Sequence, residues 1–253
     1  MATTAASLGR VLLLLSAAAA FGSEQVSLPA GRFAPLFGLD VGQQDFPVGA
    51  FSLDVRPVSR AEFEKFLEAQ PKWRAPSRAL ADERYLASWG SPLAAHAPVV
   101  EISWFAARAY CAWKGGRLPS TLEWEYAAAA DETRRNASRD PVFAQRILDW
   151  YARPARPGDL ERPGSPRNAW GVEAMHGLVW EWTDDFNGVF VTGDNRQDGD
   201  KSTNFMCGSG ATGSERREDY AAFMRSALRS SLTARSTSRH LGFRCAESGK
   251  VTP

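Results

Sequence analysis

The sequence contains few sulfur and imidazole ligands, has no charge excess, and lacks an apolar segment long enough to span a membrane. Its 253 residues include three Cys, four Met and three His, and 30 basic residues stand against 29 acidic ones. This balance argues against nucleic acid or an anionic membrane as a partner. The sequence has no glycine-rich phosphate loop, Gly-x-Ser-x-Gly turn or His-Glu-x-x-His helix, so nucleotide-binding and hydrolase functions have no support.

The first 22 residues have the pattern of a secretory signal peptide. One basic residue precedes the apolar segment Val11–Phe21, which is shorter than the roughly 20 residues of a membrane-spanning helix. Small residues for cleavage follow at Ala20-Phe21-Gly22. We therefore expect residues 1–22 to be removed and the exported domain, residues 23–253, to be periplasmic or secreted without a membrane anchor. A buried N-terminal helix is the alternative interpretation.

Export would affect the three cysteines, Cys111, Cys207 and Cys245. In an oxidising compartment two of them are expected to pair, and their number alone leaves open which two.

Three segments in the first half of the domain predict helices. Ser59-Arg60-Ala61-Glu62 and Ser120-Thr121-Leu122-Glu123 are capping boxes, and Ser103 precedes a helical pattern that ends at Gly115-Gly116. The third helix is expected to continue into the alanine run 127–130. Two or three helices near the front of the domain are therefore expected.

Beyond these helices the sequence predicts little regular structure. Residues 152–167 contain four prolines and residues 184–219 are rich in Gly, Asp, Asn and Ser, so both segments are expected to be mostly loop. Residues 241–245 resemble a short terminal strand. Nine Trp residues suit a compact core with irregular connections. The expected fold is one α+β domain that is rich in loops.

Several longer motifs resemble the formylglycine-generating enzyme (sulfatase-modifying factor) family, in order and spacing, over roughly residues 58–246. They are Glu101–Trp104 followed by AYCAWKGGRLPSTLEWEYAA, then Asn168-Ala169-Trp170-Gly171, Met175-His176-Gly177, Val179-Trp180-Glu181-Trp182-Thr183 and Leu241-Gly242-Phe243-Arg244-Cys245-Ala246. The resemblance implies the family's C-type-lectin-like variant fold. Residues 171–182 and 205–210 are most similar to the branch that accompanies copper nitrite reductase.

The resemblance implies a copper(I) site of two thiolates, but this sequence departs from it. Phe205-Met206-Cys207 resembles the motif that carries the first thiolate, whereas counting back from Leu241 places the second at Ala221. Copper(I) prefers soft sulfur ligands and Cys207 alone cannot form the pair, so copper is not expected. Cys207 stays the one candidate catalytic residue, with a small buried hydrophobic residue as the alternative. The iron-dependent branch is excluded because three histidines without a preceding helical domain cannot supply its site.

The resemblance also implies a disulfide and a calcium site. The pairing it implies is Cys111 with Cys245. For calcium it implies the carbonyls of Gly177 and Val179 with the carboxylate of Glu181, but Ala174 and Leu178 replace side-chain oxygen ligands. Calcium normally takes six to eight oxygens, so calcium is the expected cofactor only if other groups complete the site.

Two sets of charged residues are further candidates for a ligand site. Asp194–Gly199 superficially resembles an EF-hand, but Arg196 and Phe205 occupy ligand positions, so a solvated loop is expected. Five arginines could gather around an anion or a peptide carboxylate, or could be surface or ion-paired residues. They are Arg225, Arg229, Arg235, Arg239 and Arg244.

Three functions therefore remain open. The first is an exported accessory or maturation factor that lacks the two-cysteine copper site and acts on a protein or peptide client. The second is a formylglycine-generating oxidase that modifies a sulfatase cysteine with an altered site around Cys207. The third is a binding module that uses a lectin-like scaffold without catalysis.

Overall fold

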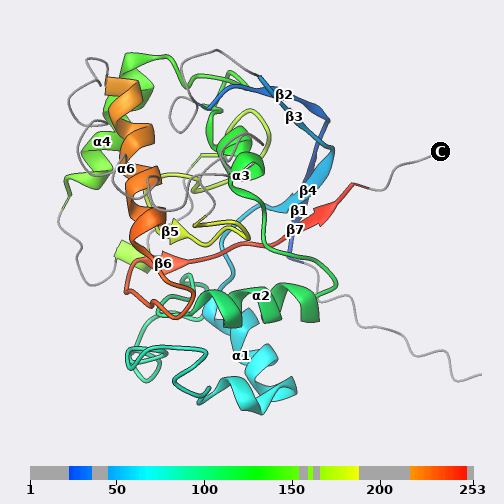
Figure 1. Ribbon diagram of the computed structural model, residues 1–253, viewed down its shortest axis with the longest axis vertical. Helices are drawn as coiled ribbons and strands as arrows, with labels where there is room; N and C mark the ends of the chain where they lie inside the picture. Colours follow the sequence, from blue (N-terminus) through cyan, green and yellow to red (C-terminus); the bar gives the residue numbers. More distant parts are fainter. Residues whose placement is uncertain (1–22, 36–44, 154–158, 162–165, 188–216, 250–253) are drawn as a thin grey trace, which may run out of the picture.

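The computed structural model describes residues 23–35, 45–153, 159–161, 166–187 and 217–249. Within them, three small sheets and five α-helices are joined by long irregular connections (Figure 1). No helix among the described residues is both long enough and apolar enough to cross a membrane. The mixture of short strands and helices confirms the expected α+β class.

The largest sheet is built from chain segments that lie far apart in the sequence. Strand β4 (Phe51–Asp54) pairs antiparallel with β1 (Gln25–Leu28) on one side and with β7 (Ala246–Ser248) on the other. Leu53 stands opposite both Val26 and Ala246, so this register brings the two ends of the described chain together. Two further pairs are the antiparallel β2 (Gly31–Phe33) with β3 (Phe46–Val48), and the parallel β5 (Trp180–Glu181) with β6 (Leu241–Gly242).

The three predicted helices are present, each with the expected N-cap. They are α1 (Arg60–Ala69), α2 (Trp104–Trp113) and α3 (Thr121–Ala128). Ser59 and Ser120 form complete capping boxes, and the Ser103 hydroxyl accepts from the Ala106 N–H. Helix α2 ends where Gly115 adopts a φ of 88°, which residues with a side chain rarely adopt.

The prediction that regular structure is sparse after α3 is confirmed only in part, because two helices that the sequence did not predict lie there. Helix α4 (Pro141–Tyr151) and helix α6 (Arg217–Ser231) lie in the second half and pack side by side (Figure 1). The described residues also include two short 3-10 turns, η1 (Pro71–Trp73) and η2 (Asp159–Glu161). Of the terminal strand expected at 241–245, only β6 at Leu241–Gly242 is present, and β7 begins directly after the expected range at Ala246.

Helices α4 and α6 were missed for different reasons. Helix α4 carried a signal, because Asp140 caps it with its carboxylate and Pro141 occupies the first turn, where a missing N–H costs nothing. The buried face of α6 carries arginine, since Ala221, Ala222, Arg225 and Arg229 are its buried positions. Two of these four buried positions are therefore charged, and both arginines pair with the buried carboxylate of Glu125.

Aromatic side chains fill much of the core, as the tryptophan content predicted. One cluster surrounds α1 and α2 and includes Phe63, Tyr110, Trp182 and Phe243, whereas a second lies between the largest sheet and α3. Tyr110 stacks on Phe63 and meets Phe243 edge to face. These packed rings fix the irregular connections between short elements.

Candidate functional site

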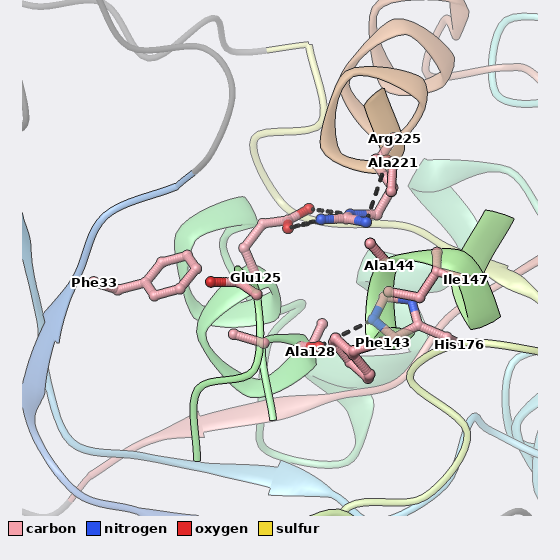
Figure 2. A pocket seen from close by; sticks show the side chains of 11 residues that line it. Phe33, Glu125, Ala128, Phe143, Ala144, Ile147, His176, Ala221 and Arg225 are labelled. Carbon is pink, nitrogen blue, oxygen red and sulfur yellow. Dashed lines mark hydrogen bonds and ion pairs between the residues drawn. The ribbon is translucent and has the colours of Figure 1, made fainter. Parts of the chain in front are cut away.

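A small cavity lies where α3, α4 and α6 meet the segment that precedes β5 (Figure 2). Its volume of about 20 Å³ is the size of one water molecule. Apolar side chains of α4, among them Phe143 and Ile147, close one side. The polar residues that line it are Glu125 from α3, Arg225 from α6, Ser138 and His176.

Glu125 is a buried anion held by two buried cations. Arg225 Nη2 donates to Glu125 Oε2 over 2.7 Å and Arg225 Nε donates to Oε1 over 2.9 Å, while Arg229 Nη1 donates to Oε1 over 2.7 Å. Burial by itself raises the pKa of Glu125, but the two guanidinium groups outweigh it and lower the pKa to about 2. Glu125 is therefore ionised and unsuited to general acid or base chemistry at neutral pH.

The cation side of this cluster has further contacts. Arg225 Nη1 also donates to the Tyr151 hydroxyl and to the Ala221 carbonyl, each over 3.3 Å. The Arg229 guanidinium lies over the Trp124 ring, 4.9 Å from its centroid. Two arginines thus tie α6 to α3 and α4.

His176 is the polar group of the cavity with an unused atom. Its Nε2 lies 3.0 Å from the Ala128 carbonyl, which can only accept, so the proton is assigned to Nε2. Nδ1 is then a buried lone pair with no partner among the described residues. Burial, reinforced by the charge of Arg225, lowers the pKa of His176 to about 3, so the ring is neutral.

The cavity does not fit the two-thiolate copper site that the resemblance implies. Ala221, the position aligned with the second thiolate, lies in its wall. No sulfur atom is found among the described residues that line it, and the Glu125 carboxylate is fully engaged by arginine. Among the described residues of this wall, the sulfur ligands that copper(I) prefers are therefore missing. Within the described part of the chain, no group of three His, Cys, Asp or Glu side chains could hold a metal ion.

Cys207, the candidate catalytic residue, lies outside the described residues, as do the neighbouring Met206 and the Asp194–Gly199 segment.

The disulfide that the resemblance implied is confirmed. Cys111 of α2 is bonded to Cys245, with their Cα atoms 5.5 Å apart. Both residues are buried in the aromatic core beside Tyr110 and Phe243. Because the sequence has three cysteines, Cys207 is the one that remains outside the bridge.

Arg244 binds the one carboxylate among the residues expected to bind calcium. Arg244 Nε and Nη2 donate to Glu181 Oε2 and Oε1, each over 2.8 Å, and both side chains are fully buried. Trp124 Nε1 donates to the same Oε2 over 2.8 Å. Gly177 has a φ of 100°, and Val179 is buried. The carboxylate of Glu181 is thus occupied by protein donors, and calcium binding here stays a prediction.

The five arginines do not gather around one anion site. Arg225 and Arg229 bind Glu125, and Arg244 binds Glu181, so three of them are buried ion-pair partners. Arg235 donates to the Arg78 carbonyl, and Arg239 Nε lies 3.6 Å from Glu101 Oε1. The expectation of surface or ion-paired residues is therefore confirmed, since Arg225, Arg229 and Arg244 are buried ion-pair partners and the other two are exposed. Sequence reasoning missed Glu125 as their partner because a glutamate inside a helix gives no sign of its burial.

The model of the sulfatase-modifying factor enzyme 1-like domain matches residues 14–248, which is most of the chain. The chain belongs to this family. The resemblance found in the motifs is therefore confirmed, although the match alone does not assign an activity.

Curated relatives of this sulfatase-modifying-factor chain differ in what their names state. It is 35% identical over 201 residues to the formylglycine-generating enzyme of Streptomyces coelicolor, covering 71% of this chain and 59% of that one. It is 27% identical over 209 residues to the inactive C-alpha-formylglycine-generating enzyme 2 of Bos taurus, covering 62% and 69%. It is 31% identical over 160 residues to hercynine oxygenase of Mycobacterium tuberculosis, where the match covers 54% of this chain and 38% of that protein.

A solved structure supports the fold. PvdO from Pseudomonas aeruginosa is similar with a TM-score of 0.51 and 20% identity, covering 89% of this chain and 94% of that one. The expected lectin-like variant fold of the family is therefore confirmed.

Proposed function

We propose that this family member is an exported accessory or maturation factor that binds a protein or peptide client and lacks the copper oxidase chemistry. The observation that carries the proposal is the Cys111–Cys245 disulfide, which leaves one thiol in a chain of three cysteines. A two-thiolate copper(I) site needs a second sulfur, and its aligned position, Ala221, lies beside the Glu125–Arg225 pair instead.

The relatives are compatible with this proposal because they include a protein named as an active formylglycine-generating enzyme and one named as inactive. The same scaffold therefore occurs with and without that activity, and the donor atoms of each chain must decide. Here those donors are arginine, carboxylate and a neutral imidazole rather than paired thiolates.

Copper binding and peptide oxidation test the proposal together. Purified, disulfide-intact protein is titrated with Cu(I) against a competing chelator, and oxygen uptake is followed with a sulfatase-type cysteine peptide. We expect weak copper binding and no formylglycine in the peptide by mass spectrometry. Cys207→Ala is the matched variant, and we expect it to behave as the wild type. Stoichiometric tight copper with peptide oxidation that Cys207→Ala abolishes would instead establish the altered oxidase.

The lectin-like alternative needs a separate arm. Immobilised glycans are probed with the same protein, and free sugar is added as a competitor. Saturable, sugar-competed binding would favour a carbohydrate-binding module over a client-binding factor.

Export is part of the proposal and has its own support. The Ser23 hydroxyl donates to Asp54 Oδ1 over 2.6 Å, and the Val55 N–H donates to the Glu24 carbonyl over 2.8 Å. Residues directly after the expected cleavage site are thus part of the fold, and removal of residues 1–22 would leave these contacts intact. N-terminal sequencing of protein from its native host should begin near Ser23, whereas an intact Met1 on the cytoplasmic protein would contradict export.

A further inference from the structure

We propose that a second, larger cleft binds an apolar ligand that ends in a carboxylate. The cleft, of about 450 Å³, is lined by the loop after β4, the start of α1, the turn at His96–Pro98 and the segment Glu173–Leu178. We call it the Arg56 cleft. Its volume falls in the range of small-molecule sites, and it is far larger than the cavity at Glu125. The proposal is independent of any chemistry at Cys207.

Much of the wall is apolar. Six of the residues that line it carry no polar side-chain atom: Val55, Pro57, Pro98, Leu160, Ala174 and Leu178. A ligand with an aliphatic body would remove this surface from water, at roughly 25 cal/mol per Å² of apolar area buried.

The acidic groups of the cleft already have partners. Glu173 accepts from Arg56 Nε over 2.6 Å and from Arg167 Nε over 3.2 Å. Arg167 also donates to Glu24 over 2.7 Å. Glu62 accepts from the Ser59 N–H over 2.8 Å in the capping box of α1. The hydrogen bond and charge of Arg56 lower the pKa of Glu173, so this carboxylate stays ionised and paired.

Basic donors, by contrast, remain free. Arg56 uses Nε and Nη2 on Glu173, and no partner of its Nη1 is found among the described residues. The Arg56 side chain is 66% exposed, so Nη1 is accessible to a ligand. His96 is exposed and likewise makes no hydrogen bond within the described part of the chain. Free N–H donors beside an apolar wall favour a ligand with oxygen acceptors, and a carboxylate forms strong, charge-assisted hydrogen bonds with a guanidinium group.

The buried residue Arg244 links two segments that line the Arg56 cleft. Arg244 Nη1 donates to the Val55 carbonyl over 3.0 Å, and Arg244 Nη2 donates to the Glu173 carbonyl over 2.9 Å. The Glu173 N–H also donates to the Val55 carbonyl over 2.9 Å. Next to it, Ala174 is held at a φ of 54°, a left-handed conformation that costs energy for a residue with a Cβ. The walls are therefore preorganised, which lowers the entropy cost of binding.

The test is a titration of the disulfide-intact protein with N-acetyl-L-leucine, followed by protein-observed NMR. The matched probe is N-acetyl-L-leucine amide, which has the same body without the carboxylate. We expect saturable binding of the acid, at least tenfold weaker binding of the amide, and shifts confined to residues of the Arg56 cleft.

Variants separate a specific site from a general charge effect. Arg56→Gln should weaken binding of the acid at least tenfold. Arg32→Gln, which removes a positive charge from β2 outside the cleft lining, should leave binding unchanged. Leu178→Trp, which narrows the apolar side, should also weaken binding and carries the test if Arg56→Gln does not fold.

A second arm separates a peptide end from a free acid. If acetyl-Ala-Ala-Leu binds at least tenfold more tightly than N-acetyl-L-leucine, the ligand is a peptide C-terminus; equal affinities indicate a small free acid. Absence of saturable binding, or equal binding by wild type and Arg56→Gln, would overturn the proposal.

Discussion

Replacing Glu125 by Gln should destabilise the protein strongly, because it leaves two buried guanidinium groups without a counter-ion. Arg225 and Arg229 both lose their carboxylate partner, and each is less than 10% exposed. Removing one member of a buried ion pair typically costs about 3–5 kcal/mol. Gln keeps one acceptor oxygen, so we expect a loss of about 3 kcal/mol in the free energy of unfolding. Urea unfolding at pH 7.5 under non-reducing conditions measures it.

The pH dependence gives an independent magnitude for the same interaction. The pKa of Glu125 falls from 4.5 to about 2 on folding, and each unit corresponds to about 1.4 kcal/mol. The folded carboxylate thus binds a proton less readily than the unfolded one. The resulting stabilisation, about 3 kcal/mol, is complete above pH 4.5 and is lost as the pH falls towards 2. The difference between wild type and Glu125→Gln should therefore shrink across this window.

Glu132→Gln is the matched control for Glu125→Gln. Glu132 also pairs with an arginine, since Arg146 Nη1 lies 2.8 Å from its Oε1, but both side chains are exposed. Exposed pairs contribute about 0–1 kcal/mol, so this variant should unfold almost as the wild type does. A loss below about 1 kcal/mol for Glu125→Gln, or a difference that stays constant between pH 7.5 and pH 3, would refute the reasoning.

Three further outcomes follow from the same contacts. His176 is held neutral with a pKa of about 3, so the free energy of unfolding should decrease as the pH falls from about 6.5 towards 3. His176→Gln should make the urea midpoint depend less on pH in that window, and an unchanged pH dependence would contradict this. The double variant Cys111→Ala/Cys245→Ala opens a 134-residue loop and should lose up to about 5 kcal/mol; dithiothreitol should destabilise the wild type but not this variant. Arg244→Met should lower the free energy of unfolding by about 3–5 kcal/mol, because it leaves the buried Glu181 carboxylate without a counter-ion. Adding Glu181→Gln should restore part of this loss in a double-mutant cycle, whereas strictly additive losses would argue against the ion pair.

Local chemistry made part of the fold predictable. The serine caps of α1, α2 and α3 lie beside the helices they start, so their hydrogen bonds join residues three apart. The start of α4 is predictable in the same way, since Asp140-Pro141 is a local helix-start signal. The pairing of the core strands cannot be predicted from local sequence, because β4 pairs with β1 and β7 from opposite ends of the described chain.

By itself, the sequence determined the family, the fold class, the number of cysteines and the absence of a second copper cysteine at Ala221. Only the tertiary structure decided what the charged residues do. Glu125 meets Arg225 across 100 residues, and Arg244 meets Glu181 across 63. The physical reason is that burial and pairing of charge depend on which distant elements pack together, whereas sequence spacing reports only neighbours on one element. The Arg56 cleft has the same origin, because Val55 and Glu173 come from distant segments and Arg244 donates to both of their carbonyls.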